Sequence, residues 1–125
     1  MEPALMMQTA TGLLAVSAAG GLAMAGIRFS GKPTPPTWLA MLHGFLSAAA
    51  LTLLLYAWFT VGLPGMAQLA LLLFLAAAAG GAFMNLNFHW KMLPLPIWLV
   101  LVHAGVAVCG FLLLVIATWR VSHPY

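Results

Sequence analysis

Residues 6–24 read MMQTATGLLAVSAAGGLAM, and residues 66–84 read MAQLALLLFLAAAAGGAFM. With a shift of 60 residues and no gap, the Gly-Gly pair and the flanking methionines of one stretch fall on those of the other. The same register continues further along the chain, where it aligns Pro36 with Pro96, Trp38 with Trp98, His43 with His103, and Leu53-Leu54 with Leu113-Leu114. Apolar residues often match by chance, but Gly-Gly, Pro, Trp and His matching in one register indicate an internal repeat.

The composition of the chain indicates that its solvent is lipid. Of its 125 residues, 65% are hydrophobic and 4% are charged, whereas about a quarter of the residues of a soluble domain are charged. A helix needs about 20 apolar residues to cross a bilayer. Four segments meet this requirement: Ala4–Ile27, Thr37–Val61, Met66–Phe88 and Pro96–Trp119. The sequence therefore predicts an all-α membrane protein with four transmembrane helices.

Short connections set the expected arrangement of these helices. The connections are Arg28–Pro36, Gly62–Gly65 and His89–Leu95, each of which contains proline. Such short connections make neighbouring helices antiparallel. We expect one transmembrane domain over residues 1–125, an up-down bundle made of two tandem helical-hairpin repeats at residues 5–59 and 65–119. Because each repeat holds two spans, the halves should be related by a pseudo-two-fold axis along the membrane normal.

The few charged residues predict the orientation in the membrane. Arg28, Lys32 and Lys91 lie where the first and third spans end, whereas Glu2 and Arg120 lie on the other side. By the positive-inside rule the first side is cytoplasmic. We therefore expect a multi-pass protein of a bacterial-type inner (plasma) membrane with both termini on the outer, periplasmic side.

The first span and the single cysteine each allow another interpretation. Ala23-Met24-Ala25 resembles a signal-peptidase site, but the segment lacks a basic start and recurs later in the chain, so we expect it to remain a span. The one cysteine, Cys109, leaves no disulfide framework and no Cys-x-x-Cys-His motif for covalent haem attachment.

Two histidines lie inside the predicted spans, where ionisable side chains are costly and by default functional. His43 follows Thr37 by six residues and His103 follows Pro96 by seven, so at 1.5 Å per residue each lies roughly 10 Å inside its helix. The second and fourth spans should run parallel and face each other across a diagonal of the bundle. The two imidazoles should therefore converge on one central point, as the axial ligands of a haem iron do.

Small residues at matched positions predict room for a porphyrin next to this pair. Glycine at the histidine depth would let a ring edge pass close to the backbone. The candidate haem-contacting residues are Gly20, Gly21, Gly80 and Gly81 at the histidine depth, and Ser47, Ala50, Ala107 and Gly110 one and two turns deeper. The expected partners of the propionates are Arg28, Lys32 and Lys91, and the expected walls of the pocket are Trp38, Phe45, Trp98 and Phe111.

With His43, His103 and the facing glycines, the chain resembles the membrane-bound b-type cytochromes, in which a four-helix bundle holds haem between histidines of diagonally placed helices. The resemblance covers all four spans in architecture and implies one haem b, with iron ligated by His43 and His103, and a role in electron transport. The chain departs from the larger members, which carry two stacked haems and four ligating histidines, because its spans hold no second pair.

A single haem on one side of the membrane suits local electron exchange with a quinone, or partnership with another redox subunit or a second copy of the chain. Quinone reductase or oxidase activity stays open at this point. The lipid bilayer is the expected surrounding, and no nucleic acid is expected as a partner.

Other interpretations of the same residues also stay open. The paired histidines and Gly-Gly pairs are consistent with interhelical hydrogen bonds and close packing alone. Met24, Met41 and Met84 are consistent with copper, because thioethers suit Cu(I). The alternatives are therefore a copper- or haem-handling membrane protein and a structural subunit of a larger membrane complex. We interpret His89 as an interfacial surface residue first and a quinone or propionate contact second, and His123 as solvated.

Overall fold

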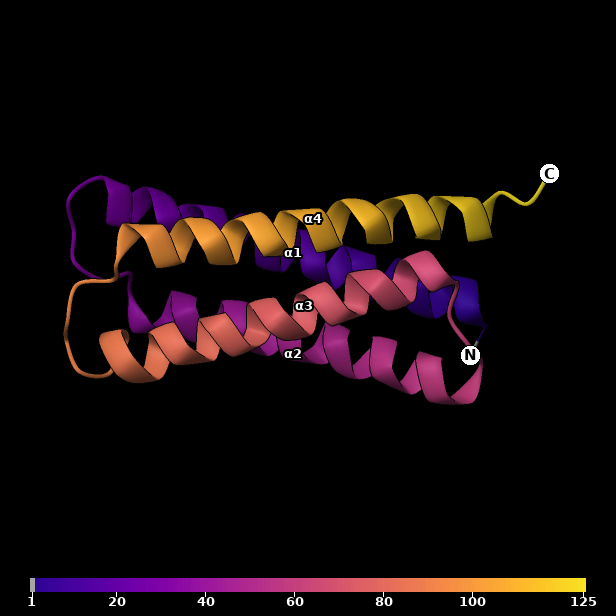
Figure 1. Ribbon diagram of the computed structural model, residues 1–125, viewed down its shortest axis with the longest axis horizontal. Helices are drawn as coiled ribbons and strands as arrows, with labels where there is room; N and C mark the ends of the chain where they lie inside the picture. The colour runs from indigo at the N-terminus through magenta and orange to yellow at the C-terminus, as the bar shows by residue number, and fades with distance from the viewer. Residues whose placement is uncertain (1) are drawn as a thin grey trace.

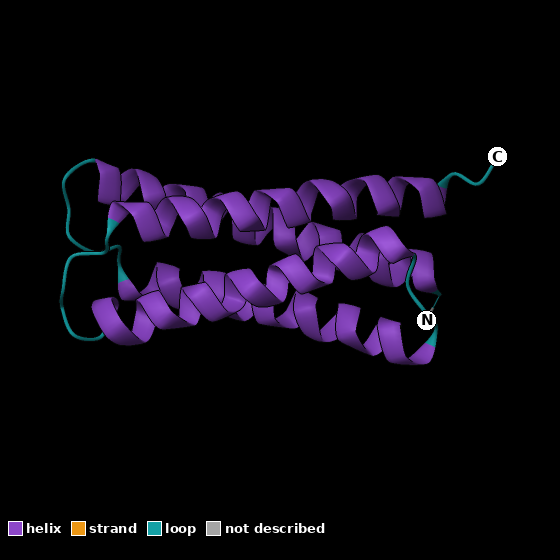
Figure 2. Ribbon diagram, in the orientation of Figure 1, coloured by secondary structure: helices purple, strands orange, loops and turns teal. Residues whose placement is uncertain are grey.

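The computed structural model describes residues 2–125, which form four long helices joined by short loops (Figures 1 and 2). Their bounds are α1 Pro3–Phe29, α2 Thr37–Thr60, α3 Gly65–Met84 and α4 Ile97–Ser122, and a π-helical turn, η1 Asn85–His89, continues α3. All four are long and apolar enough to cross a membrane. The prediction of a multi-pass, all-helical membrane protein is confirmed to that extent.

Proline and glycine set the ends of these helices. Pro3 occupies the first position of α1, and prolines occupy the N-cap positions of the other three α-helices. The first N–H groups of a helix have no partner within the helix, so proline, which has no N–H, costs no hydrogen bond there. Gly31 and Gly62 follow α1 and α2 with φ of 103° and 82°, a conformation that ends a helix and that glycine adopts at little cost.

The contacts between helices are neighbour to neighbour. α1 packs against α2 and α4, and α3 packs against α4 and α2, with the most extensive contacts within the α1–α2 and α3–α4 hairpins. Within the described chain, no such contact joins α1 to α3 or α2 to α4. The α1–α2 and α3–α4 connections lie at one end of the molecule, which we call the loop end, and both termini lie at the other (Figure 1).

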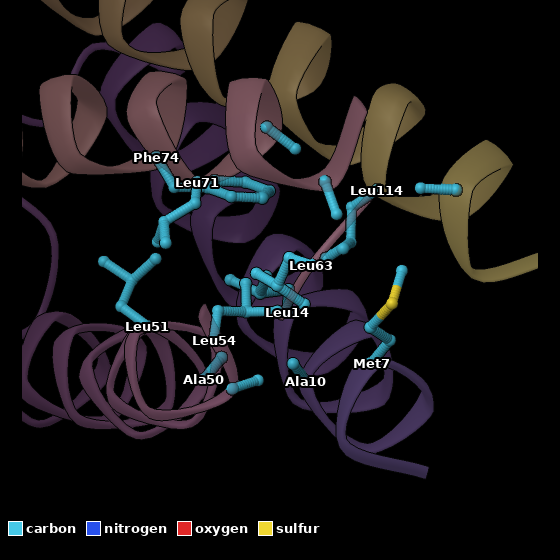
Figure 3. Packing of buried hydrophobic residues seen from close by; sticks show 14 of the residues in the cluster. Met7, Ala10, Leu14, Ala50, Leu51, Leu54, Leu63, Leu71, Phe74 and Leu114 are labelled. Atoms are coloured by element: carbon cyan, nitrogen blue, oxygen red, sulfur yellow. The ribbon is translucent and has the colours of Figure 1, made fainter. Parts of the chain in front are cut away.

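The hydrophobic core lies in the half of the molecule next to the termini. It is built from large side chains such as Leu14, Leu54, Phe74 and Leu114, packed around alanines from all four helices (Figure 3). In the half next to the loop end, the side chains and glycines that face the neighbouring helices are mostly only half-buried. The two halves of the bundle therefore differ in burial, and both predicted histidine ligands lie in the more exposed half.

Burial repeats along the chain with the same shift as the sequence. Residues 60 apart are buried together as Met7 and Ala67, Ala10 and Ala70, Leu14 and Phe74, Ser17 and Ala77, Ala50 and Gly110, Leu54 and Leu114, and Ala57 and Ala117. The match ends near residue 85, because α1 continues as an α-helix to Phe29 whereas α3 changes to the π-helical turn η1. π-helical turns inside longer helices are frequent at functional sites.

Candidate functional site

The structure brings His43 of α2 and His103 of α4 together. Their ring centroids are 6.2 Å apart and the ring planes are inclined by 71°. Both side chains are half-buried. The backbones of the two helices do not approach each other closely, so the imidazoles meet in the space between them, as their equal depth in the helices predicts.

Each imidazole is held by a hydrogen bond to the preceding helix. His43 Nδ1 lies 2.8 Å from the carbonyl oxygen of Ser17, and His103 Nδ1 lies 2.8 Å from that of Ala77. A carbonyl oxygen can only accept, so each Nδ1 carries the hydrogen and each Nε2 keeps its lone pair. A backbone carbonyl on one ring nitrogen is a common arrangement in histidines that bind metal through the other.

The two histidines differ in the residue whose carbonyl oxygen they contact, which is Ser17 for His43 and Ala77 for His103. The Ser17 hydroxyl lies 3.0 Å from His43 Nδ1 and 2.6 Å from the Ser47 hydroxyl, and it donates to the carbonyl oxygen of His43 at 3.1 Å. The equivalent residue beside His103 is Ala77, which has no hydroxyl. The His43 side of the pair therefore carries a polar network that the His103 side lacks.

The Gly-Gly pairs accommodate the imidazoles. A Cβ added to Gly21 would lie 3.0 Å from His43 Cε1, and one added to Gly81 would lie 3.1 Å from His103 Cε1. A Cβ added to Gly20 would lie 3.8 Å from Leu39 Cδ1, and one added to Gly80 would lie 3.9 Å from His103 Nδ1. The glycines were predicted to pass a porphyrin edge, but in the structure each pair receives the histidine ring of its own hairpin.

Three of the four small residues predicted to clear space beside the ligands serve helix packing. A Cβ on Gly110 would lie 3.3 Å from Ala70 O and from atoms of Leu73 and Phe74, all on α3. Ala50 is fully buried in the hydrophobic core, and Ser47 is hydrogen-bonded to Ser17. These contacts show which neighbour each residue meets, which the helical period alone does not give, and the prediction that the residues line a haem stays a prediction. Ala107 is half-buried.

The predicted propionate partners and aromatic walls are dispersed. Arg28 Nε donates to the carbonyl oxygen of Leu95 at 2.8 Å and so joins the end of α1 to the α3–α4 connection, while Lys32 and Lys91 are exposed. Three predicted wall residues are exposed at the outer surface, namely Trp38, Phe45 and Trp98. Of that set only Phe111 packs against the core. An amphipathic aromatic near a span end is suited to the membrane interface, which explains the outward tryptophans.

His89 is buried, contrary to its interpretation as a surface residue. Only 7% of it is exposed, and its Nε2 lies 3.2 Å from Thr37 Oγ1 at the start of α2. The π-helical turn places it there, whereas Phe29, its counterpart in the first hairpin, is exposed. No sequence pattern singles out Thr37 as a partner of His89 or signals the π-helical turn. His123 is exposed, as expected, and stacks on Trp119.

The three methionines named for the copper alternative differ in burial. Met84 is buried, Met24 is half-buried and Met41 is exposed. Within residues 2–125, no group of three or more His, Cys, Asp and Glu side chains is arranged to hold a metal ion. The pair of imidazoles is therefore the strongest candidate centre.

Comparisons with known proteins give no further guide. No family model matches the chain. No curated protein and no solved structure matches it either. Its function is therefore inferred from the side chains and their geometry.

Proposed function

We propose that the chain is a membrane b-type cytochrome that binds one haem b between α2 and α4, with Nε2 of His43 and Nε2 of His103 as the axial ligands. The observation that carries this proposal is the meeting of two imidazoles at 6.2 Å, each with its Nδ1 hydrogen committed to a carbonyl oxygen. Both remaining nitrogens are then free to ligate one iron.

The separation of the rings fits two ligands of a single metal. An imidazole nitrogen lies about 2 Å from a metal that it binds, so two such nitrogens on opposite sides are about 4 Å apart. Each ring centroid lies one ring radius further from the metal than its nitrogen, so the two centroids should be about 6 Å apart. The centroids of His43 and His103 are 6.2 Å apart, in agreement with this separation. If the two histidines served only to join helices by hydrogen bonds, there would be no reason for the Nε2 atoms of both rings to lack a hydrogen-bond partner.

The exposure around the histidines leaves surface for a cofactor to cover. The residues at the histidine level are only half-buried, including Gly20, Gly21, Gly80 and Gly81. The hydrophobic core lies in the other half of the bundle. A flat apolar ring between the helices would complete the interior at the histidine level.

The proposal includes an up-down bundle of two tandem hairpin repeats, related by a pseudo-two-fold axis along the membrane normal, with both termini outside. The neighbour-to-neighbour helix contacts, the buried pairs 60 residues apart and the matched hydrogen bonds of His43 and His103 support it. The bound haem would supply reversible one-electron transfer. The residues of the chain position it, fix the tautomer of both ligands and keep formal charges out of the surroundings of the iron.

A neutral carrier dissolved in the bilayer, such as a quinone, is the partner that suits this protein best. The only Asp, Glu, Lys and Arg residues are Glu2, Arg28, Lys32, Lys91 and Arg120, all at or near the ends of the helices. The interior therefore offers no charged group to bind an ionic substrate. A redox subunit or a second copy of the chain, with lipid around it, is the other partner that we propose.

The proposal is tested by expressing the chain with haem available, purifying it in detergent and recording the absorbance. A Soret band and the sharp visible bands of a reduced low-spin cytochrome are expected, with about one haem per chain. A purified, folded protein without a Soret band would refute the proposal. If that colourless protein retained copper, the copper-handling alternative would take its place.

A further inference from the structure

The loop end of the molecule carries basic side chains and no acidic one. Arg28, Lys32 and Lys91 lie there, whereas the fourth basic residue, Arg120, lies near the end of α4 on the side of the termini. The only Asp or Glu of the chain is Glu2, directly before α1. The length of α1 therefore separates it from Arg28, which is about 40 Å at 1.5 Å per residue. The loop end is a cationic surface without a counter-charge of its own.

Hydrogen bonds at Leu95 bring two of these cations to the same place. The backbone N–H of Leu95 donates to the carbonyl oxygen of Pro33 at 3.1 Å, and the carbonyl oxygen of Leu95 accepts from Arg28 Nε at 2.8 Å. Leu95 is buried, so this link lies beneath the surface of the loops. Lys32 directly precedes Pro33 and is exposed. Arg28 and Lys32 are thereby held beside the α3–α4 connection.

A second link joins the same two connections and carries the third cation. Nε2 of the buried His89 lies 3.2 Å from Thr37 Oγ1, at the start of α2. Lys91 follows His89 by two residues and is exposed. All three cations therefore lie on connections that are hydrogen-bonded to each other.

Arg28 is half-buried, and its charge is not compensated within residues 2–125. Its Nε is bonded to Leu95, but a guanidinium carries four further N–H groups on its two Nη atoms. Within the described chain, no buried side-chain nitrogen or oxygen lacks a partner, so these Nη groups reach the surface. A charged group that is partly removed from water is costly unless an opposite charge pairs with it. An anion bound at the Nη atoms would supply that charge.

Exposed tryptophans place Arg28 at the depth of lipid phosphates. Trp38 begins α2, Trp98 begins α4 and Trp90 follows η1, so all three lie at the loop end, with exposed fractions of 67%, 65% and 67%. Outward tryptophans at the ends of spans lie at the level of the lipid headgroups. The anion that Arg28 meets at this level is a lipid phosphate, which a guanidinium can bind with two parallel hydrogen bonds.

We propose that the loop end binds the headgroup of an anionic phospholipid, with Arg28 on its phosphate and Lys32 and Lys91 as surrounding positive charges. Basic residues next to a membrane span attract anionic lipids. The dipoles of α2 and α4 add to this attraction, because both helices begin at this end. A zwitterionic lipid suits the site less well, since no carboxylate is present there to receive its ammonium group. The site uses neither His43 nor His103 and does not rest on the cytochrome function.

The test is mass spectrometry of intact protein–lipid complexes, with the purified full chain in detergent and equal amounts of phosphatidylglycerol or phosphatidylcholine. The wild type should retain one phosphatidylglycerol in preference to phosphatidylcholine. Arg28→Gln should weaken that binding roughly 10-fold or more, the effect of hydrogen bonds to a charged group. Lys32→Gln and Lys91→Gln should each weaken it roughly 5-fold.

The matched control is Arg120→Gln, which removes the same charge at the opposite end of the molecule and should bind as the wild type does. Thermal unfolding verifies that each variant is folded. The two lysine variants keep the test valid if Arg28→Gln is unstable, because both lysines are exposed at the surface.

Four results would overturn this site. The first is equal retention of the two lipids by the wild type, and the second is an equal loss in Arg120→Gln and the loop-end variants, which would show an effect of net charge only. Displacement of the lipid by millimolar inorganic phosphate would make the site one for soluble anions. Displacement by added haem would assign Arg28 to the haem propionates. Selective lipid binding by a chain that takes up no haem would support this site and refute the cytochrome alone.

Discussion

The contact between each Gly-Gly pair and its histidine gives a quantitative test of ligand positioning. In Gly21→Ala the new methyl would lie 3.0 Å from His43 Cε1, and in Gly81→Ala it would lie 3.1 Å from His103 Cε1. Carbon atoms prefer a separation of about 3.5–4.0 Å, so the ring must move by roughly 0.5 Å. Metal ligand distances tolerate only about 0.2 Å. Each variant should therefore bind haem more weakly while the apoprotein, whose ring can turn aside, still folds.

The expected loss follows from the cost of overpacking. An extra methyl in a tight site costs about 1–3 kcal/mol, which corresponds to roughly 5- to 150-fold weaker haem binding if the bound state carries the whole cost. The assay is titration of the apoprotein with haem, followed by Soret absorbance. The controls are Gly44→Ala and Gly105→Ala, next to or near each ligand on the same helices, where an added Cβ meets nothing within 4 Å.

The controls also separate positioning from helix stability. Alanine favours a helix by about 1 kcal/mol over glycine, so all four variants gain in intrinsic helix propensity and only two disturb an imidazole. Equal haem affinity in the Gly21, Gly81, Gly44 and Gly105 variants would refute the idea that the glycines position the ligands.

Three further predictions concern the surroundings of the pair. His89→Ala should lower the thermal unfolding midpoint by a few degrees, because it removes the hydrogen-bond partner of the part-buried Thr37 hydroxyl. The haem spectrum should stay unchanged, and its loss would make His89 a ligand. Ser17→Ala should retain haem and raise its reduction potential in a redox titration, because the His43 Nδ1 hydrogen loses a second acceptor and the ligand becomes less basic; a lower potential would contradict that hydrogen bond. A reporter active only in the cytoplasm should work when fused after Lys91 and be silent at either terminus, and the opposite pattern would reverse the orientation.

The repeat and the helix rise sufficed to predict that the two histidines meet. The repeat is read from the sequence, because a shift of 60 residues places His43 on His103. The fixed rise per residue of a helix then converts the position of each histidine into its depth in the membrane. The hydrogen bonds from both Nδ1 atoms could not be predicted, because a backbone carbonyl is present at every residue and only the packing of one helix on another selects Ser17 and Ala77.

Errors arose where the neighbour of a helix face had to be known. Gly110 shares a face with His103 in the helical period, but in the structure it packs against Ala70, Leu73 and Phe74 of α3. His89 was misplaced because a π-helical turn changes the direction of the side chains that follow it. The position of the hydrophobic core near the termini does not follow from composition, because apolar residues occur along the whole of each span.

The absorbance spectrum of single histidine variants tests the central claim most directly. If His43 and His103 are the axial ligands, replacing either one by alanine should abolish the bis-histidine spectrum and most of the bound haem, because one imidazole cannot hold low-spin iron alone. His123→Ala, at an exposed histidine stacked on Trp119, is the matched control and should keep the wild-type spectrum and about one haem per chain. Retention of the wild-type spectrum in either the His43 or the His103 variant would contradict the account.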